Sequence, residues 1–223
     1  SGISLMARPA HIDPTQANYK KLLRALAEQN RTAQVARPLA QIEKIIKIPV
    51  MVPDWLAGQW LRTETNETTR KELPSGKALR ALGRQAAIVT DTFGTYKDKK
   101  GRIWMLVPLL ATGCVDRGFA IDYHKVRKYQ LCMTGKNTAV VKVLASHQVV
   151  SKRDQRVVDA YQDEELNQYT LVKEGLVKTD SSVKVFDQMG KARMLTRAAS
   201  MEKRLRKFIE KCLVERHTNL DKL

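Results

Sequence analysis

Hydrophobic residues recur with a helical period near the N-terminus of the chain. After an Asp-Pro pair, a combination that caps and opens helices, apolar residues repeat every three or four positions, and this predicts a helix over residues 14–30. A second helix is predicted to begin at Pro38, to turn Ile46 inward and to end at Pro49 and Pro53. We therefore expect the chain to begin with a helical arm.

The pattern changes to period two after Trp55. Short runs of β-branched and aromatic residues are split by turn residues, which is typical of an antiparallel meander. Because few crossover helices separate the runs, the pattern favours an antiparallel β-barrel or a strongly curved sheet over a doubly wound parallel sheet. Strands are predicted near residues 58–66, 85–93, 102–109, 117–123, 126–133, 138–149, 166–173, 176–186 and 190–197.

The helical period returns near the C-terminus. From Ser200 to about His217, six apolar residues over 13 positions line one face and cations fill the rest, which predicts an amphipathic helix that docks on the sheet. The expected fold class is therefore α+β, and mainly antiparallel β. It comprises a helical arm over residues 1–52 and a barrel or strongly curved sheet over residues 53–223 that ends in this C-terminal helix.

Charge points to an anionic partner. The chain has 40 Lys and Arg against 23 Asp and Glu, a formal net charge of +17. Such a field attracts an acidic protein face, anionic lipid or nucleic acid without choosing among them, and the alternative is that the charge only keeps the protein dispersed. The predicted partner-binding residues are Lys97, Lys99, Lys100, Arg102, Lys203, Arg204, Arg206, Lys207 and Lys211.

Catalytic motifs are missing from the sequence. No serine lies in a nucleophile elbow, and the histidines are far apart with no metal-spaced pair among His11, His124, His147 and His217. We therefore predict no catalytic residues, no metal site, no cofactor and no enzymatic activity.

Cysteine use and the first residues leave the compartment open. Cys114 and Cys132 are expected on adjacent strands, and a bridge between them is predicted if the protein is exported; otherwise they are small buried apolar residues. The opening Ser-Gly-Ile-Ser-Leu-Met fits either an exported chain whose signal has been removed or a native start at Met6. A periplasmic or secreted location is favoured, with a cytoplasmic one if Met6 is the start.

Two short motifs carry a family resemblance. Gly58-x-Trp60, at the start of the first predicted long strand and after a helical lead-in, resembles the opening motif of lipocalin-like barrels. Asp122-Tyr123 resembles part of the second motif of the same superfamily. The resemblance implies a closed barrel whose interior is filled by side chains or holds a small apolar molecule.

The resemblance also implies an arginine in the last strand. In lipocalin-like barrels this arginine packs over the motif tryptophan, and guanidinium groups stack well on indole rings. Arg193 and Arg197 are the candidates for the arginine over Trp60.

These features predict a non-enzymatic binding or assembly protein that docks an anionic partner or holds a small apolar ligand. The alternative is a nucleic-acid-binding protein that uses the basic C-terminal helix and the loop over residues 97–102. Aromatic residues make up only 6% of the chain and do not interleave with the basic run, so the stacking contacts typical of single-strand binders are few.

Overall fold

The computed structural model describes residues 45–94 and 96–207. Every regular secondary-structure element in these ranges is a β-strand. In chain order the strands are β1 (Ile46–Val52), β2 (Gly58–Glu72), β3 (Ala78–Leu79), β4 (Gly83–Phe93), β5 (Tyr96–Lys97), β6 (Ile103–Leu109), β7 (Thr112–Asp116), β8 (Ala120–Gly135), β9 (Thr138–Ser151), β10 (Val157–Lys173), β11 (Leu176–Phe186) and β12 (Ala192–Arg206). None of these residues forms a helix of the length and apolarity that crossing a membrane requires. The predicted helix over residues 14–30 lies outside the described residues.

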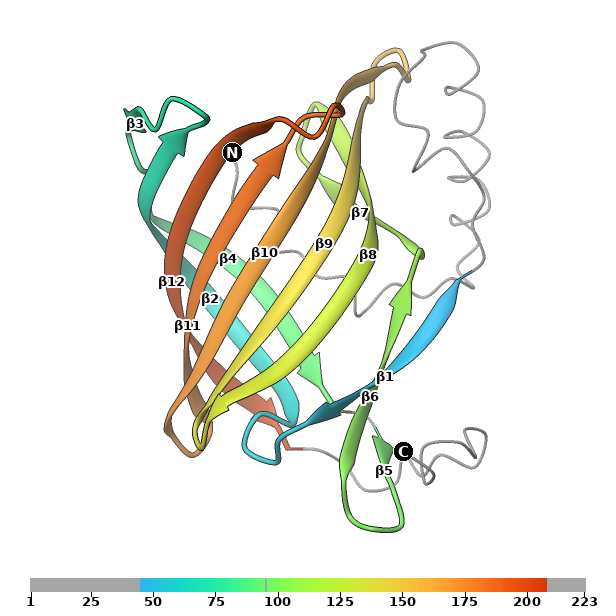
Figure 1. Ribbon diagram of the computed structural model, residues 1–223, viewed down its shortest axis with the longest axis vertical. Helices are drawn as coiled ribbons and strands as arrows, with labels where there is room; N and C mark the ends of the chain where they lie inside the picture. Colours follow the sequence, from blue (N-terminus) through green and yellow to red (C-terminus); the bar gives the residue numbers. More distant parts are fainter. Residues whose placement is uncertain (1–44, 95, 208–223) are drawn as a thin grey trace.

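A nine-stranded antiparallel sheet forms most of the fold (Figure 1). Strands β7 to β12 pair in sequence order, β12 then pairs with β2, and β4 and the short β3 follow one another along the far edge of β2. The predicted antiparallel meander is confirmed. The closed barrel is not: within the described ranges, β4 and β7 remain edges and do not pair with each other.

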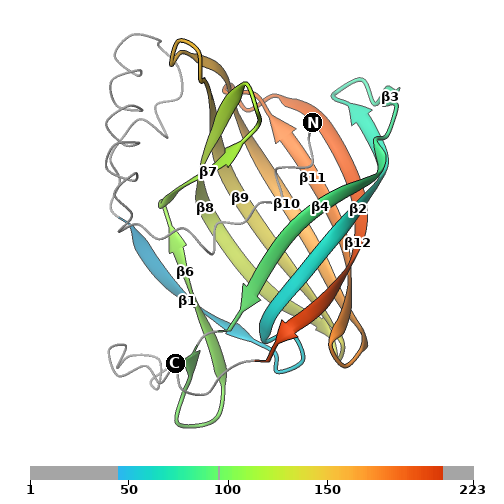
Figure 2. The same cartoon turned by 180° about the vertical axis from the view of Figure 1, so that it is seen from behind.

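Long strands and register shifts bend this sheet. β2, β8, β9, β10 and β12 are 14 to 17 residues long, and the ladders shift register within β2, β8 and β12. Such bulges add to the natural twist of a sheet. In both views the sheet curls so that strands β2 and β4 lie across from strands β9, β10 and β11 (Figures 1 and 2). The sheet therefore has a concave face.

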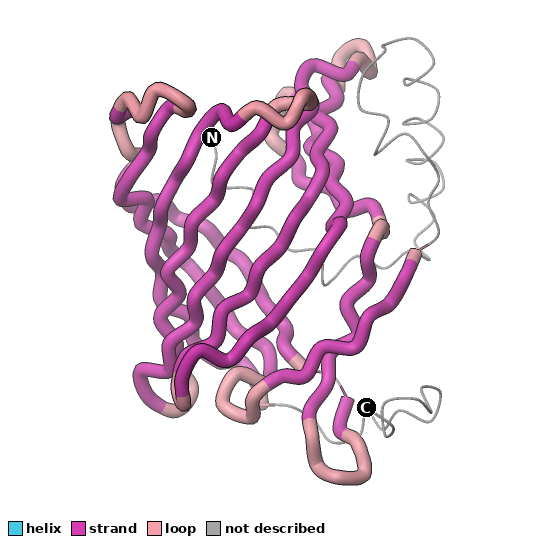
Figure 3. The backbone as a smooth tube through the Cα atoms, viewed as in Figure 1, coloured by secondary structure: helices cyan, strands magenta, loops and turns pink. Residues whose placement is uncertain are grey.

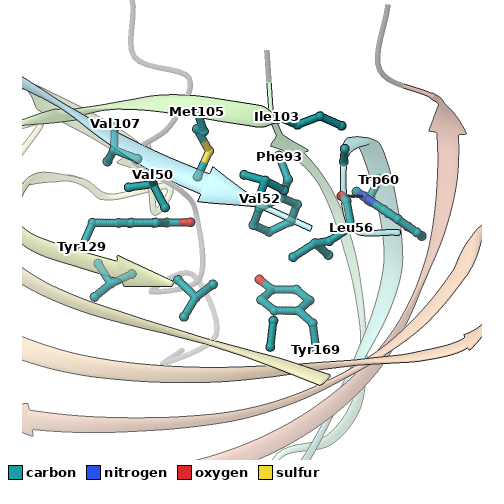
Figure 4. Packing of buried hydrophobic residues seen from close by; sticks show 14 of the residues in the cluster. Val50, Val52, Leu56, Trp60, Phe93, Ile103, Met105, Val107, Tyr129 and Tyr169 are labelled. Atoms are coloured by element: carbon teal, nitrogen blue, oxygen red, sulfur yellow. Dashed lines mark hydrogen bonds between the residues drawn. The ribbon is translucent and has the colours of Figure 1, made fainter. Parts of the chain in front are cut away.

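The small sheet packs on one end of this concave face. Its order is β1-β6-β5, and β1 pairs with β6 along its full length (Figure 3). Val52 and Val107 from the small sheet belong to one apolar cluster with Tyr129, Val141 and Tyr169 from the large sheet (Figure 4). Apolar side chains of the concave face are thus covered by a second layer rather than left open to water.

The segment after Pro38 was predicted as a helix, and from Ile46 onward it is strand β1 instead. Ile48, Val50 and Val52 alternate toward the core cluster, which is the period of a strand. Pro49 lies within β1 and does not end a helix. Proline is tolerated there because β1 is an edge of the small sheet, where one side of the strand needs no N–H donors.

The predicted C-terminal helix is also wrong over residues 200–206, where β12 continues. Pairing with β11 and β2 fixes an alternation in which Ser200 and Glu202 are buried. Met201 and Leu205, which the helical pattern assigned to a docking face, are 45% and 52% exposed on the other side. Residues 208–217 of the predicted helix lie outside the described part of the chain.

Two further strand predictions differ in detail. Residues 117–123 and 126–133 were predicted as separate strands, and residues 120–135 instead form the single strand β8, with a register shift next to Arg127. The preceding strand β7 was not predicted. A bulge interrupts the period-two pattern without ending the strand, which is why the sequence reads as two runs.

Trp60 anchors the end of the sheet where β2 begins. Its side chain is fully buried, as predicted, and its indole Nε1 donates a 2.7 Å hydrogen bond to the carbonyl oxygen of Leu56. The guanidinium of Arg204 lies 4.7 Å from the centre of the indole ring and donates a 2.6 Å hydrogen bond to the Trp55 carbonyl oxygen. Gly58 fits beside this contact because a Cβ on it would lie 2.5 Å from the carbonyl oxygen of Arg206.

The arginine over Trp60 is therefore Arg204, and the assignment to Arg193 or Arg197 was wrong. Arg193 is exposed and pairs with Asp159 at 3.4 Å, and Arg197 is exposed beside Thr69 of β2. The correction follows from the length of β12. Because the strand runs to Arg206 instead of ending near residue 197, the arginine that reaches the start of β2 comes seven residues later than the expected end.

We predict that Trp60→Ala lowers the free energy of unfolding by about 3–5 kcal/mol, the usual cost of removing a large buried aromatic side chain. Arg204→Gln is expected to lower it by about 1–3 kcal/mol, because both the ring contact and a charge-assisted hydrogen bond are lost. Urea denaturation of the purified chain measures both effects. The matched control is Arg197→Gln on the same strand, which should change the free energy by less than about 0.5 kcal/mol. Equal effects of the two arginine variants would contradict the contact described here.

Candidate functional site

A cluster of buried polar side chains lies where β8, β9 and β10 run side by side. Register places His124 opposite His147 and His147 opposite Tyr161, while Asp163 lies two residues further along β10. His147 shares the alternation of Val141 on β9, so the cluster lies on the same concave face as the apolar core. The fifth member, Asp122, precedes His124 by two residues on β8 and therefore points to the same side.

His147 is held between two carboxylates. Its Nδ1 lies 2.9 Å from Oδ1 of Asp122, and its Nε2 lies 3.0 Å from Oδ2 of Asp163. Its ring also stacks on Tyr161, with centroids 4.5 Å apart and planes 5° from parallel. The imidazole is therefore fixed in position at both ring nitrogens and across one face.

Asp122 receives its other contacts on its second oxygen. The Tyr161 hydroxyl donates a 2.7 Å hydrogen bond to Oδ2, and the Arg117 guanidinium donates to the same atom. Arg117 also donates to the Tyr161 hydroxyl oxygen at 2.8 Å. These contacts orient the carboxylate so that Oδ1 faces His147.

The two carboxylates determine the charge of His147. Burial alone lowers the pKa of His147, but the negative charge of Asp163 and the hydrogen bonds to Asp122 and Asp163 outweigh burial and raise the pKa from 6.5 to about 9. Burial raises the pKa of Asp122, whereas the hydrogen bond and charge of His147 and the contacts of Tyr161 and Arg117 bring it below its usual value. The cations Arg117 and His147 thus balance the carboxylates of Asp122 and Asp163 at neutral pH.

His124 has the opposite character. Burial, reinforced by the positive charge of His147, lowers the pKa of His124 from 6.5 to about 4, although Asp122 opposes the shift. The side chain is 5% exposed, and its Nε2 has no hydrogen-bond partner among the described residues. A neutral imidazole nitrogen that lacks a partner in a buried site is a ligand atom in the protonation state that metals bind.

Three of these side chains are close enough to share one ion. Asp122, His124 and His147 each offer a ligand atom, and these atoms lie within 4.8 Å of one another. The arrangement suits a buried ion-pair network, a metal site, or both in turn.

Sequence reasoning missed this cluster because it considered the histidines by their separation along the chain. Only Asp122-x-His124 carries a local signal, since residues two apart on a strand share a face. The remaining members, His147 and Asp163, come from neighbouring strands, and their positions depend on a register that the pattern of residues does not fix.

The predicted basic residues divide between one groove and its surroundings. Lys97, Arg204 and Lys207 line a groove of about 500 Å³ at the end of the large sheet, although residue 97 and residues 204–207 are far apart in sequence. Lys99 and Lys100 are exposed in the β5–β6 turn. The Asp98 carboxylate organises this turn: it pairs with Arg102 at 2.6 Å and accepts backbone hydrogen bonds from residues 100 and 102.

The other predicted basic residues are placed differently. Arg206 is exposed at the end of β12, whereas Lys203 lines a separate groove of about 440 Å³ together with Leu61 and Met201. Arg204 had been predicted to face outward; it is instead half-buried over Trp60, and part of its side chain lines the groove. Lys211 lies outside the described residues.

The predicted bridge between Cys114 and Cys132 is wrong. Both cysteines are free and exposed. Cys114 pairs with Tyr123 across the β7–β8 ladder, and Cys132 follows nine residues later on β8. At about 3.3 Å per residue, the two sulfurs are roughly 30 Å apart along the strand, far beyond disulfide reach.

No protein-family profile, no curated protein and no solved structure matches this chain. The resemblance to lipocalin-like barrels therefore rests on the residues of this chain alone.

We predict that, in the presence of EDTA, the free energy of unfolding is highest near pH 6.5. His147 has a folded pKa of about 9, so its contribution is complete below its unfolded pKa of 6.5 and is lost as the pH rises through 9. His124 has a folded pKa of about 4, so its contribution is complete above 6.5 and is lost as the pH falls to 4. Each difference corresponds to roughly 3 kcal/mol.

Urea denaturation between pH 4 and pH 9.5 measures this profile. His124→Phe serves as the control: it should flatten the acid side, apart from what the carboxylates contribute, and should leave the alkaline side in place. A stability that still increases between pH 7 and pH 9 would contradict the charge assigned to His147.

Proposed function

We propose that this protein is a non-enzymatic binding protein that docks an acidic surface of a partner protein. The observation that supports this function is the groove at the end of the large sheet, where two basic segments distant in sequence come together. Lys97 comes from the β5–β6 hairpin, and Arg204 and Lys207 come from the end of β12.

The composition of the groove suits a protein partner. Trp55, Ile103 and Leu171 supply apolar lining, and the three cations are accompanied by two acidic side chains, Asp54 and Glu174, of which Glu174 pairs with Lys207. An apolar centre with a charged rim is the usual anatomy of a protein–protein interface. Lys99, Lys100 and Arg206 are exposed nearby and extend the positive rim, which accelerates encounter with an acidic surface.

A lipocalin-like origin of the scaffold is part of the proposal. Gly58, Trp60 and Arg204 together reproduce the contact that the resemblance implies, with the arginine at a later position than expected. The small apolar cargo of such barrels has less support. In this chain β1 and β6 pack on the larger apolar part of the concave face, and the remainder combines a smaller apolar cluster with buried polar groups.

Nucleic-acid binding is the second candidate function. The feature that favours it is Trp55, a half-buried aromatic residue beside three cations, because base stacking on an aromatic side chain next to basic residues is a common mode of single-strand binding. Other large aromatics of the described core, such as Trp60, Phe93 and Tyr169, are buried and offer no stacking surface. We therefore rank this function second.

The test removes four exposed cations at the groove end, Lys99, Lys100, Arg206 and Lys207, by substitution with Gln. Arg204 is kept because it supports Trp60. Exposed cations add little to stability but much to polyanion encounter, so the melting temperature should stay nearly unchanged while binding to poly-L-glutamate weakens at least tenfold in 50 mM salt. The dependence of affinity on salt should become flatter. Fluorescence anisotropy with labelled polyglutamate measures both quantities.

The matched control removes the same number of exposed cations elsewhere on the large sheet. Lys77, Arg80, Arg153 and Arg156 lie in the β2–β4 connection and the β9–β10 turn, at the opposite end from β5 (Figure 1). If both variants lose the same affinity, net charge and not the groove drives binding, and the proposal fails. If a single-stranded oligonucleotide binds more tightly than polyglutamate of equal charge and depends on the same four residues, the nucleic-acid function replaces it.

A further inference from the structure

We propose that Asp122, His124 and His147 form a binding site for one divalent transition-metal ion, with zinc the best match to the ligands. This site is independent of the basic groove. Its supporting observations are the convergence of three ligand atoms within 4.8 Å and the buried Nε2 of His124, which has no hydrogen-bond partner among the described residues.

The unpartnered nitrogen is the reason to expect a ligand. A buried polar atom that makes no hydrogen bond costs about 1–3 kcal/mol, and of the unpartnered buried atoms in the described residues only Nε2 of His124 belongs to the three residues whose ligand atoms converge. The two nearby carboxylate oxygens, Oδ1 of Asp122 and Oδ2 of Asp163, already contact the nitrogens of His147, so they do not supply a hydrogen bond to Nε2 of His124. A cation between the two rings and Asp122 supplies the missing partner.

The surrounding contacts resemble the outer shell of a metal site. In such sites a ligating histidine donates its second N–H to a carboxylate, which fixes the tautomer and the ring orientation. Asp163 accepts from Nε2 of His147 in this way and leaves Nδ1 to face Asp122. Tyr161 and Arg117 occupy only Oδ2 of Asp122, so its Oδ1 is the oxygen directed at the site.

Metal binding requires a proton to leave and a small movement of side chains. The proton now shared between Nδ1 of His147 and Asp122 is released to solvent, and the ion takes its place, so that His147 binds as a neutral imidazole. Around a tetrahedral zinc, ligand atoms at about 2.0–2.2 Å from the ion lie roughly 3.4 Å apart. The three ligand atoms lie within 4.8 Å of one another, so binding has to draw the most distant pair together by up to about 1.4 Å.

The ligand set selects among metals. Two imidazoles and one carboxylate favour zinc and related first-row ions over calcium or magnesium, which prefer all-oxygen sites. Three protein ligands leave a fourth position for water or for a bound anion.

The experiment uses the full chain, stripped with EDTA and dialysed. Titration with Zn²⁺ by calorimetry should give one ion per chain with micromolar or tighter affinity, and Co²⁺ should give the visible absorption of a four-coordinate site. In His124→Phe, which removes the ligand without breaking the bridges of His147, zinc affinity should fall more than 100-fold, beyond the 10–100-fold typical of outer-shell changes. Asp163→Asn changes only the outer shell, so its loss of zinc affinity should lie within this 10–100-fold range.

The double variant His11→Ala/His217→Ala is the matched control, because it removes the other two histidines of the chain. It should bind zinc as the unaltered protein does. Circular dichroism and cooperative unfolding establish that each variant folds, and His124→Asn replaces His124→Phe if the latter does not. The proposal is overturned if the stripped protein takes up no zinc, or if a folded His124 variant binds zinc as tightly as the unaltered chain.

Discussion

The structure depends on removing one face of a long, bent sheet from water. Strands of up to 17 residues alternate between bulges, so about every second side chain points toward the concave face and must find a partner there. At one end the partner is the small sheet, which turns that half into an apolar core. At the other end a second, smaller apolar cluster around Val149, Tyr161 and Val183 lies beside buried charged groups, which are tolerated because they neutralise one another.

The sequence predicted the strands well because period two is a strong signal wherever one face is buried. The run over residues 176–186 matches β11 in full. The errors occurred where apolar residues fit both periods. The stretch from Pro38 through Ile46 and the stretch from Ser200 both read as helical, and from Ile46 and from Ser200 onward pairing with a neighbouring strand decided the outcome. Propensity is a weak prior against such tertiary contacts.

Candidate sites were harder to predict than strands. The basic residues at 97–100 and 206–207 were identified from charge alone, but only the fold shows that the two segments meet at one groove. His124 and His147 were set aside because they are 23 residues apart, yet cross-strand register makes them neighbours. Spacing rules describe sites within one element and have no access to register between elements. The groove and the histidine cluster lie toward opposite ends of the concave face, separated by the apolar core.

Pro49 has an effect beyond the strand in which it lies. The outer side of β1 presents backbone groups that another extended chain is able to pair with, and unprotected strands of this kind promote fibre growth. Proline interrupts that row because it carries no N–H, so an incoming strand meets a gap in the middle of β1. A residue that predicted the end of a helix therefore lies in the edge strand of the small sheet among the described residues, at a position where an added strand would find no N–H donor.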